Sequence, residues 1–170
     1  MDPAALEKYI NEYGREVYSF CMYLTRNKED ADDLYQQTFL VAYEKNSIDE
    51  NKNPKSYLIT ISVNIWNNQK RKVLWRRNKA DIIHFHDESL NQIEDDKDSV
   101  EEEVIRKEDQ IRVRRFVDAL PDRYRIVRLM FYMENMSMDE IASALKVPEG
   151  TVKSRLHKAK QLLKEKLAYE

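Results

Sequence analysis

Glycine and proline are scarce in this chain: only two of its 170 residues are glycine and four are proline. Average usage would give about 12 glycines, and tight turns and strand-rich folds depend on these two residue types. Apolar side chains recur instead at helical spacing, as in residues 4–24 and 149–166. The sequence therefore predicts an all-α fold, and it excludes collagen-like, low-complexity and turn-rich β architectures.

The net charge of −2 conceals an uneven distribution of charged residues. Residues 1–79 hold 13 Lys/Arg and 11 Asp/Glu (+2), residues 80–110 hold 3 and 12 (−9), and residues 111–170 hold 13 and 8 (+5). The acidic segment lacks apolar periodicity, so it cannot bury much surface. We expect two small helical domains, residues 1–79 and 106–170, joined by a flexible acidic linker over 80–105.

The first domain is expected to contain three or four helices. Residues 4–24, 29–45 and 55–79 carry helical apolar stripes, with a polar turn after the first and a loop over 46–55 after the second. Gly14 lies inside the first stripe, where it is expected to relieve a close contact. In the second helix the residues expected on the buried side are Ala31, Leu34, Phe39, Leu40 and Tyr43.

The second domain carries the strongest functional signal. Ser137 and Glu140 form a capping-box pattern at the start of a short helix, and a tight turn leads to a last helix from about residue 149. This arrangement is typical of a DNA-binding helix-turn-helix, although an ordinary helical hairpin with a solvated basic face also fits. Lys146 stands where many such turns have glycine, so the turn is expected to be strained. The residues on the exposed side of the last helix include Lys153, Ser154, Arg155, His157 and Lys158.

The end of the helix over 55–79 offers a second candidate surface. It is basic, with Trp75 among its cations and Asn64 and Asn68 one turn apart. Cations follow a nucleic-acid backbone and aromatic rings stack on unpaired bases. The alternative is that Tyr57 and Trp66 belong to the core and the lysines to a solvated face, and taken alone the pattern favours this alternative.

Three blocks of sequence resemble one family. Residues 30–39 (DADDLYQQTF) resemble the D-A-x-D-L-x-Q-x-x-F helix of bacterial sigma factors of the extracytoplasmic-function type, which belong to the sigma-70 family. Residues 54–71 resemble the promoter-melting segment of these factors, and residues 120–156 are similar to their C-terminal helix-turn-helix. The resemblance implies a transcription initiation factor that binds core RNA polymerase and directs it to promoters by −10 melting and −35 recognition.

The resemblance also implies a role for each block. The first would dock on the clamp helices of the polymerase β′ subunit through Asp32, Asp33, Gln36, Gln37 and Phe39. The second, with the loop before it, would hold an extruded −10 base and bind nearby DNA through Ile48, Lys52, Asn64, Asn68, Lys70, Arg71 and Lys72. The third would read the −35 element through Thr151, Lys153, Ser154, Arg155, His157 and Lys158.

Further expectations follow from the same resemblance. The protein partners would be core RNA polymerase, through its β′ clamp helices and β flap, and an anti-sigma factor. The acidic linker would thread toward the polymerase active-site cleft. The family usually has Gln-Glu where this chain has Gln36-Gln37, so the second residue keeps a hydrogen-bonding group but lacks the charge. Gly150 would let the start of the last helix press against DNA, and no cofactor is implied.

Two other functional classes, a DNA-binding regulator and a metal-dependent nuclease, fit parts of the sequence. A helix-turn-helix repressor or activator would bind duplex DNA unaided, as a dimer. A metal-dependent nuclease would use Asp30, Asp32 and Asp33, but these acids suit a helix start and no further carboxylate or histidine block accompanies them. His84 and His86 lack the cysteine pair of a zinc site. We therefore expect neither a metal site nor enzymatic activity.

The single cysteine, Cys21, excludes an internal disulfide and fits a reducing compartment. Because Cys21 lies on the apolar side of the first helix, we expect it in the core rather than at a redox site. The longest apolar run, residues 126–133, is interrupted by Arg128, and the N-terminus lacks a signal-peptide pattern. These features predict a cytoplasmic protein without membrane insertion.

Overall fold

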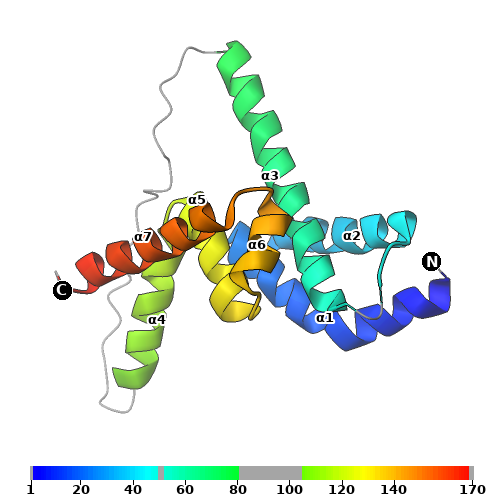
Figure 1. Cartoon of the computed structure of the whole chain (residues 1–170), viewed down its shortest axis with the longest axis horizontal. Helices are drawn as coiled ribbons and strands as arrows, with labels where there is room; N and C mark the ends of the chain where they lie inside the picture. The colour runs from blue at the N-terminus through cyan, green and yellow to red at the C-terminus, as the bar shows by residue number, and fades with distance from the viewer. Residues whose placement is uncertain (1, 50–51, 81–104, 169–170) are drawn as a thin grey trace.

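The computed structural model describes residues 2–49, 52–80 and 105–168 of the chain. Every regular element in these ranges is a helix (Figure 1). In chain order the elements are α1 (Pro3–Thr25), α2 (Lys28–Lys45), α3 (Pro54–Ala80), α4 (Ile105–Asp118), α5 (Asp122–Arg128), the π-helical turn η2 (Leu129–Met133), α6 (Met138–Leu145) and α7 (Glu149–Ala168). The predicted all-α class is confirmed. The expected linker, with His84 and His86, lies almost wholly outside the described residues, and the proposed domain boundaries stay predictions.

Side-chain caps set the ends of the first two helices. Asp2 accepts a hydrogen bond from the backbone amide two residues on, at 3.3 Å, and Pro3 occupies the first helical position. Arg26 ends α1 in the left-handed conformation, at φ 59°. Asn27 then caps α2 by accepting from the amide three residues on, at 3.1 Å. The turn between α1 and α2 is therefore only two residues long.

The core of the first half lies between α1, α2 and α3. Its fully buried side chains include Phe20, Leu34 and Leu58, one from each helix. A Cβ atom added at Gly14 would lie 2.8 Å from Tyr35 Oη, closer than real Cβ atoms approach other atoms. The predicted close contact at Gly14 is therefore confirmed, and it lies between α1 and α2.

Two of the residues expected on the buried side of α2 are exposed. Leu40 is 56% exposed and Tyr43 is 37% exposed, so the prediction was wrong for both. A helix turns by about 100° per residue, which places Leu40 on the face opposite the buried Ala31. Leu34 and Phe39 are buried as predicted. The solvent face of α2 therefore carries an unexpected apolar side chain.

α3 begins at Pro54, as predicted, and is the central helix of the molecule. Leu58, Ile59 and Val63 are all fully buried, because α1 and α2 contact α3 and α6 of the second half contacts it too. The far end of α3 extends away from the other helices (Figure 1), and residues 71–78 are exposed. α3 therefore combines a buried first half with a projecting basic end.

The segment over residues 122–134 does not form one continuous α-helix. After α5 the chain widens into a π-helical turn over Leu129–Met133, where the Glu134 amide donates to the Leu129 carbonyl at 3.2 Å. Turns of this kind insert one extra residue and shift the side chains that follow. Leu129 and Met130 are buried, and Asn135 turns the chain with φ 53°.

The helix-turn-helix has the predicted signals. Ser137 accepts from the Glu140 amide at 3.1 Å, and the Glu140 carboxylate accepts from the Ser137 amide at 3.2 Å. Lys146 turns the chain between α6 and α7 in the left-handed conformation, at φ 57°, which is strained for a residue with a Cβ atom. Val152 and Leu163 are buried on the predicted apolar side of α7.

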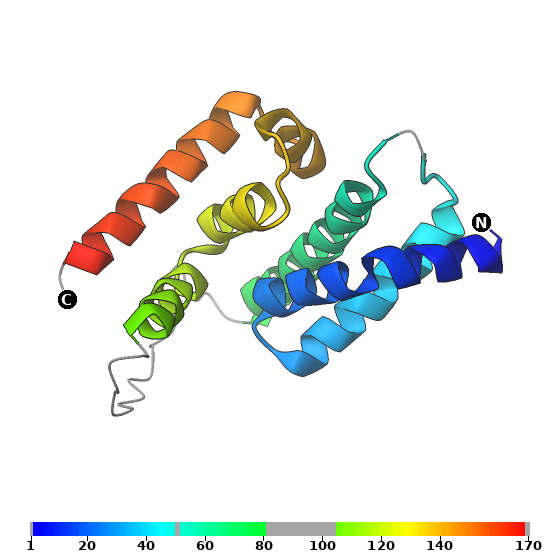
Figure 2. The same cartoon turned by 90° about the horizontal axis from the view of Figure 1, so that it is seen from below.

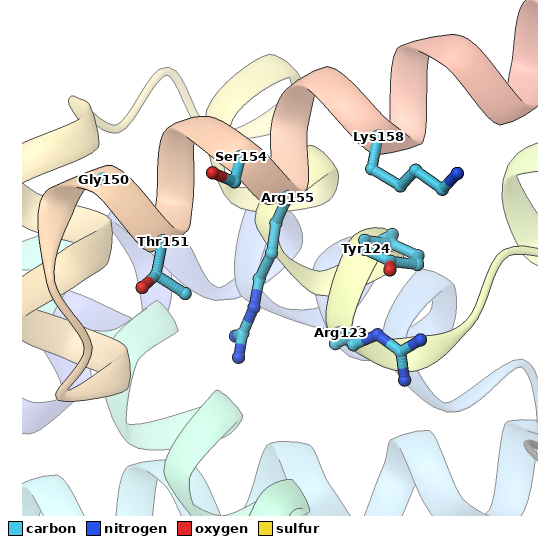
Figure 3. Close-up of a pocket in the computed structure, with 7 residues that line it drawn as sticks. All are labelled: Arg123, Tyr124, Gly150, Thr151, Ser154, Arg155 and Lys158. Carbon is cyan, nitrogen blue, oxygen red and sulfur yellow. The ribbon is translucent and has the colours of Figure 1, made fainter.

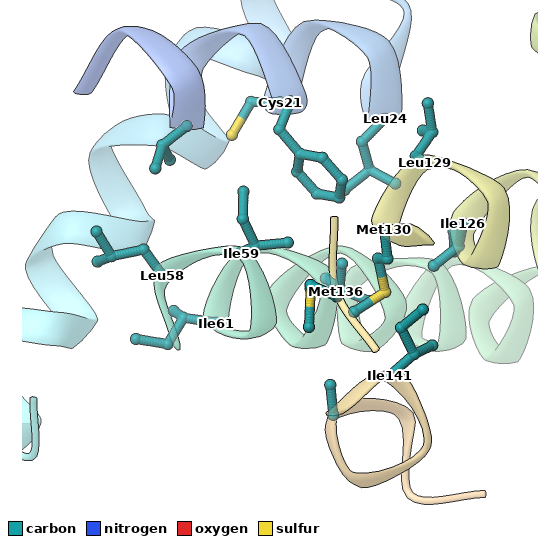
Figure 4. Packing of buried hydrophobic residues seen from close by; sticks show 14 of the residues in the cluster. Cys21, Leu24, Leu58, Ile59, Ile61, Ile126, Leu129, Met130, Met136 and Ile141 are labelled. Carbon is teal, nitrogen blue, oxygen red and sulfur yellow. The ribbon is translucent and has the colours of Figure 1, made fainter. Parts of the chain in front are cut away.

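The two halves of the chain lie side by side, α1–α3 against α4–α7 (Figure 2). One apolar cluster crosses between them: Met130, Met136 and Ile141 of the second half belong to the same cluster as Leu24 and Ile59 of the first (Figure 4). A smaller cluster around Phe116, Leu120, Ala159 and Leu163 belongs to the second half alone. The halves are therefore docked on each other as well as connected by the chain.

Candidate nucleic-acid interface

The predicted −35 residues lie on two exposed strips of α7. Thr151, Ser154, Arg155 and Lys158 recur at helical spacing on the strip that faces α5 (Figure 3). Lys153 and His157 are one turn apart on the other strip, and both are exposed. The helix thus presents cations on both sides of its buried stripe, and hydroxyls on the side that faces α5.

An open cavity of about 380 Å³ lies between α7 and the start of α5. Its lining residues are Arg123, Tyr124, Gly150, Thr151, Ser154, Arg155 and Lys158. Three of these side chains are cationic, two bear aliphatic hydroxyls and none is a carboxylate, so the cavity suits an anionic group such as a phosphate. Figure 3 shows Arg155 and Lys158 extending from α7 on the side where Arg123 and Tyr124 of α5 lie.

Sequence reasoning missed Arg123, because it precedes the helix-turn-helix and no motif marked it. The guanidinium of Arg123 lies 4.7 Å from the ring centroid of Tyr124. A cation of α5 therefore lies beside α7. At Gly150 an added Cβ atom would meet no atom within 4 Å, which leaves the space that a close approach of DNA would require.

The predicted −10 surface on α3 is only partly open. Asn68, Arg71 and Lys72 are exposed, whereas Asn64 is half-buried. Lys70 pairs with Asp122 of the second half. The ammonium of Lys70 also lies 5.0 Å from the centroid of the Trp66 ring. Burial, with repulsion from Arg125 and Arg26, lowers the pKa of Lys70 to about 8.

The loop before α3 contributes the other predicted −10 residues. Ile48 is half-buried against the core, and Lys52 is exposed and donates its amide to the Asp49 carbonyl at 3.0 Å. Tyr57 and Trp66 also pack against the core, so the alternative interpretation holds for those two rings.

Trp75 is different from the other two aromatic residues. It is 60% exposed on the projecting end of α3. Among the three aromatic rings considered for base stacking, Trp75 is therefore the one that an unpaired base can reach.

The predicted polymerase-binding residues of α2 share one face, with one exception. Asp33, Gln36 and Gln37 are exposed, and Leu40 lies between them on the same face. Phe39 is 5% exposed inside the core, so its side chain cannot contact a partner in this structure. The expectation for Phe39 is corrected accordingly: it supports the helix from beneath. A helical wheel would have found Leu40, because it lies opposite Ala31.

Two of these polar side chains are already positioned by neighbours. Asp32 accepts a hydrogen bond from the Tyr18 hydroxyl at 2.7 Å, and this bond raises the pKa of Tyr18. Gln37 accepts from Gln69 of α3 at 3.0 Å, in place of the charged contact that a glutamate would make. The α2 surface is therefore polar at its edges and apolar at Leu40.

Cys21 lies in the core, as predicted. Its side chain is fully buried, with Sγ 4.0 Å from Ser62 Oγ, and burial raises the pKa of the thiol to about 12. Among the described residues no three His, Cys, Asp or Glu side chains gather as metal ligands would, and Asp30, Asp32 and Asp33 do not form such a group. Within the same residues no helix is long and apolar enough to cross a bilayer.

Two family profiles match the two halves of the chain. Sigma-70 region 2 matches residues 9–77, and Sigma-70, region 4 matches residues 110–163. The chain is similar to the ECF RNA polymerase sigma factor SigW of Bacillus subtilis, with 28% identity over 98% of this chain and 90% of the relative. It is also similar to the ECF RNA polymerase sigma factor SigM of the same organism, with 27% identity over 94% of this chain and 93% of the relative.

Two solved structures have the same fold. The sigma factor RpoE, in a co-crystal with the anti-sigma factor NepR from Bartonella quintana, aligns with a TM-score of 0.69 and 21% identity over 95% of this chain and 96% of that chain. CnrH, in complex with the cytosolic domain of CnrY, aligns with a TM-score of 0.64 and 18% identity over 99% of this chain and 91% of that chain. With region 2 in α1–α3 and region 4 in α4–α7, this chain belongs to the sigma-70 family, as an extracytoplasmic-function sigma factor that directs RNA polymerase to promoters.

Proposed function

We propose that the chain contacts promoter DNA through α3 and α7 and core RNA polymerase through α2. The observation that carries the proposal is the carboxylate-free basic cavity beside α7, which Arg123, Arg155 and Lys158 line. Arg71 and Lys72 at the projecting end of α3 provide a second basic surface. The chain acts by binding, without a cofactor, and the polymerase performs the phosphodiester chemistry.

The two strips of α7 make different contacts at the −35 element. Arg123 and Arg155 hold a backbone phosphate in the cavity, with the hydroxyls of Thr151 and Ser154 beside it. The other strip carries the residues that reach base edges in the major groove, Lys153 and His157, and Lys158 lies at the border of the cavity. Gly150 lets the helix approach the duplex closely.

The −10 element is held by α3 and the loop before it. Asn68 and the half-buried Asn64 bond the edge of an extruded base, beside Ile48 and Lys52 of the loop. The basic end of α3 follows the DNA backbone through Lys70, Arg71 and Lys72, and Trp75 is placed for base stacking.

The proposed protein partners are core RNA polymerase and an anti-sigma factor. The chain acts in the cytoplasm together with the polymerase. Asp33, Gln36, Gln37 and Leu40 form the surface for the β′ clamp helices, with Asp32 at its edge, where the Tyr18 hydroxyl holds the carboxylate. An open groove of about 210 Å³ on the second half, apolar with a basic rim, is the surface for the β flap or an anti-sigma factor. The groove is lined by Val113, Arg128, Tyr132, Lys160, Leu163, Lys164 and Leu167.

Run-off transcription with purified core polymerase on genomic fragments tests the function. We expect promoter-specific transcripts that require the chain. If no fragment gives one, the proposal fails. A gel shift without polymerase provides the contrast, because tight binding to duplex DNA by the chain alone would indicate a repressor or activator instead.

Two substitutions separate base contacts from phosphate contacts. Lys153→Ala should cost about 1–3 kcal/mol of discrimination at one −35 position, whereas Arg123→Ala should weaken binding equally for all sequences and reduce the salt slope by about 1. Lys8→Ala, an exposed cation of α1, is the matched control and should change neither. Sequence-selective loss in Arg123→Ala would contradict the assignment.

A further inference from the structure

A cluster of charged side chains joins the two halves of the chain. The first half contributes Arg26, at the end of α1, and Lys70 of α3. The second half contributes Asp118, Asp122 and Arg125. Arg125 has no exposed surface at all. A buried cation is costly unless it is well paired, so the partners of Arg125 define the nature of this contact.

Arg125 binds the C-terminal end of α1. Its Nη1 atom donates to the carbonyls of Tyr23 and Leu24 at 2.8 and 2.7 Å, and its Nη2 atom donates to Asp122 at 2.8 Å. The last carbonyls of a helix lack partners within the helix, and the helix dipole makes that end negative. A guanidinium from one half therefore caps a helix of the other half.

The contact is made from both sides. Arg26 donates to the Asp118 carbonyl at 2.6 Å, so the residue that ends α1 also reaches α4. The guanidinium of Arg114 lies 4.3 Å from the centroid of the Tyr23 ring. Asp122, which holds Arg125, also pairs with Lys70. We call this set of contacts the interdomain clasp.

One buried hydrogen-bond donor of the interdomain clasp lacks an acceptor within the described part of the chain. The Nε atom of Arg125 is buried without a hydrogen-bond partner among the described residues. Burial lowers the pKa of Arg125 to about 10, and repulsion from Arg125 and Arg26 adds to the effect of burial on Lys70. Four cations, Arg26, Lys70, Arg114 and Arg125, lie around the two carboxylates of Asp118 and Asp122 in this cluster. The docked arrangement is therefore one that a competing partner can release.

We propose that the interdomain clasp holds region 4 against region 2 in a self-restrained state that withholds Lys70 from promoter DNA. The inference rests on the −10 role proposed for Lys70. In the docked state the ammonium of Lys70 is paired with Asp122, and separation of the halves returns it to the basic end of α3. When only a fraction of molecules is competent to bind, the apparent affinity falls by that fraction.

The experiment uses three full-length variants. Arg125→Met removes the guanidinium but keeps a long side chain in its place, and Asp122→Asn removes the charge shared by Arg125 and Lys70. Arg15→Met on the exposed side of α1 is the matched control. The measurements are the radius of gyration by small-angle X-ray scattering and the affinity for a mixed-sequence 20-nucleotide single strand, by fluorescence anisotropy without polymerase.

We expect both clasp variants to have a larger radius of gyration than wild type and the Arg15→Met control, with unchanged helix content by circular dichroism. If about a tenth of wild-type molecules are open, the single-strand affinity should rise about tenfold. The double variant Asp122→Asn/Lys70→Gln should lose most of this gain. Should Arg125→Met fail to fold, Asp122→Asn and the double variant decide the question by the same measurements.

Three results would overturn the inference: folded clasp variants that stay compact, expansion without tighter DNA binding, or a gain that persists in the double variant. Run-off transcription with core polymerase separates this inference from the proposed function. Wild-type transcripts with no difference between variants in scattering and affinity would remove the clasp alone. Expanded, tighter-binding variants without any promoter-specific transcript would remove the proposed function and leave the docking in place.

Discussion

The α1–α3 half and the α4–α7 half of the molecule are built differently. The first half buries apolar side chains such as Phe20 and Leu34 between three long helices. The second half consists mostly of shorter helices, contains a π-helical turn, and buries the guanidinium of Arg125 at its contact with the first half. A long amphipathic bundle is stabilised mainly by its own core, whereas the short helices depend on caps, turns and docking.

The two halves should therefore be destabilised by different kinds of substitution. Large-to-small changes should harm the first half most, and backbone or cap changes should harm the second. The apolar cluster shared across the contact couples the halves, so damage at the contact should be felt by both.

The largest expected effect is a cavity in the first half. Leu58→Ala removes a fully buried side chain from the shared cluster and should cost about 2–5 kcal/mol, measured by urea unfolding with circular dichroism. Leu163→Ala should cost less, because Leu163 belongs to the small cluster and is 5% exposed. Equal costs for the two variants would contradict the comparison.

Loss of the cap of α6 comes next. Ser137→Ala removes the hydroxyl that accepts from the Glu140 amide and should cost about 1 kcal/mol. Ser143→Ala, at an exposed position within the same helix, is the control and should be neutral or slightly stabilising. Differential scanning calorimetry measures both, and equal melting temperatures would show that the cap adds nothing to the second half.

A gain in stability is expected at the turn between α6 and α7. Lys146→Gly relieves a left-handed backbone at φ 57° and should stabilise the protein by up to about 1 kcal/mol. The same change at Lys164, inside the regular helix α7, should destabilise it by about 1 kcal/mol. If urea unfolding gives the two variants the same sign, the strain assigned to this turn is absent.

The smallest expected effect is a dependence on pH at the contact between the halves. Glu134 is buried beside Lys55, at 3.6 Å, and burial raises the pKa of its carboxyl. The folded protein then binds this proton at a higher pH than the unfolded chain does, so the contribution of Glu134 to stability falls as pH rises from its ordinary pKa through the raised value. Glu134→Gln should remove that dependence.

The measurement compares the unfolding free energies of wild type and Glu134→Gln at pH 5 and pH 7. The advantage of the variant should be larger at pH 7 and should shrink toward pH 5. Glu16→Gln is the control, because Glu16 is exposed and pairs with the same lysine at 3.4 Å. A difference that grows on acidification would reverse the assigned direction of the pKa.

Much of the candidate site could be predicted from the sequence, because exposed polar residues on a regular helix follow its period. Arg71, Lys72 and Lys153 are exposed where the pattern expects them. Arg123 could not be placed, since it enters the cavity beside α7 only through the packing of α5 against α7. Lys70 had the same sequence signal as its neighbours, yet its pairing with Asp122 depends on the contact between the halves.

The sequence by itself determined the helices, the capping box at Ser137 and the family, because these depend on local periodicity and short motifs. The tertiary structure decided the docking of the two halves. Arg125 reads as one more surface cation in a charged chain, and only packing shows that it is buried on the carbonyls that end α1. Its partners lie about a hundred residues away in sequence, and a period of 3.6 residues carries no information at that distance.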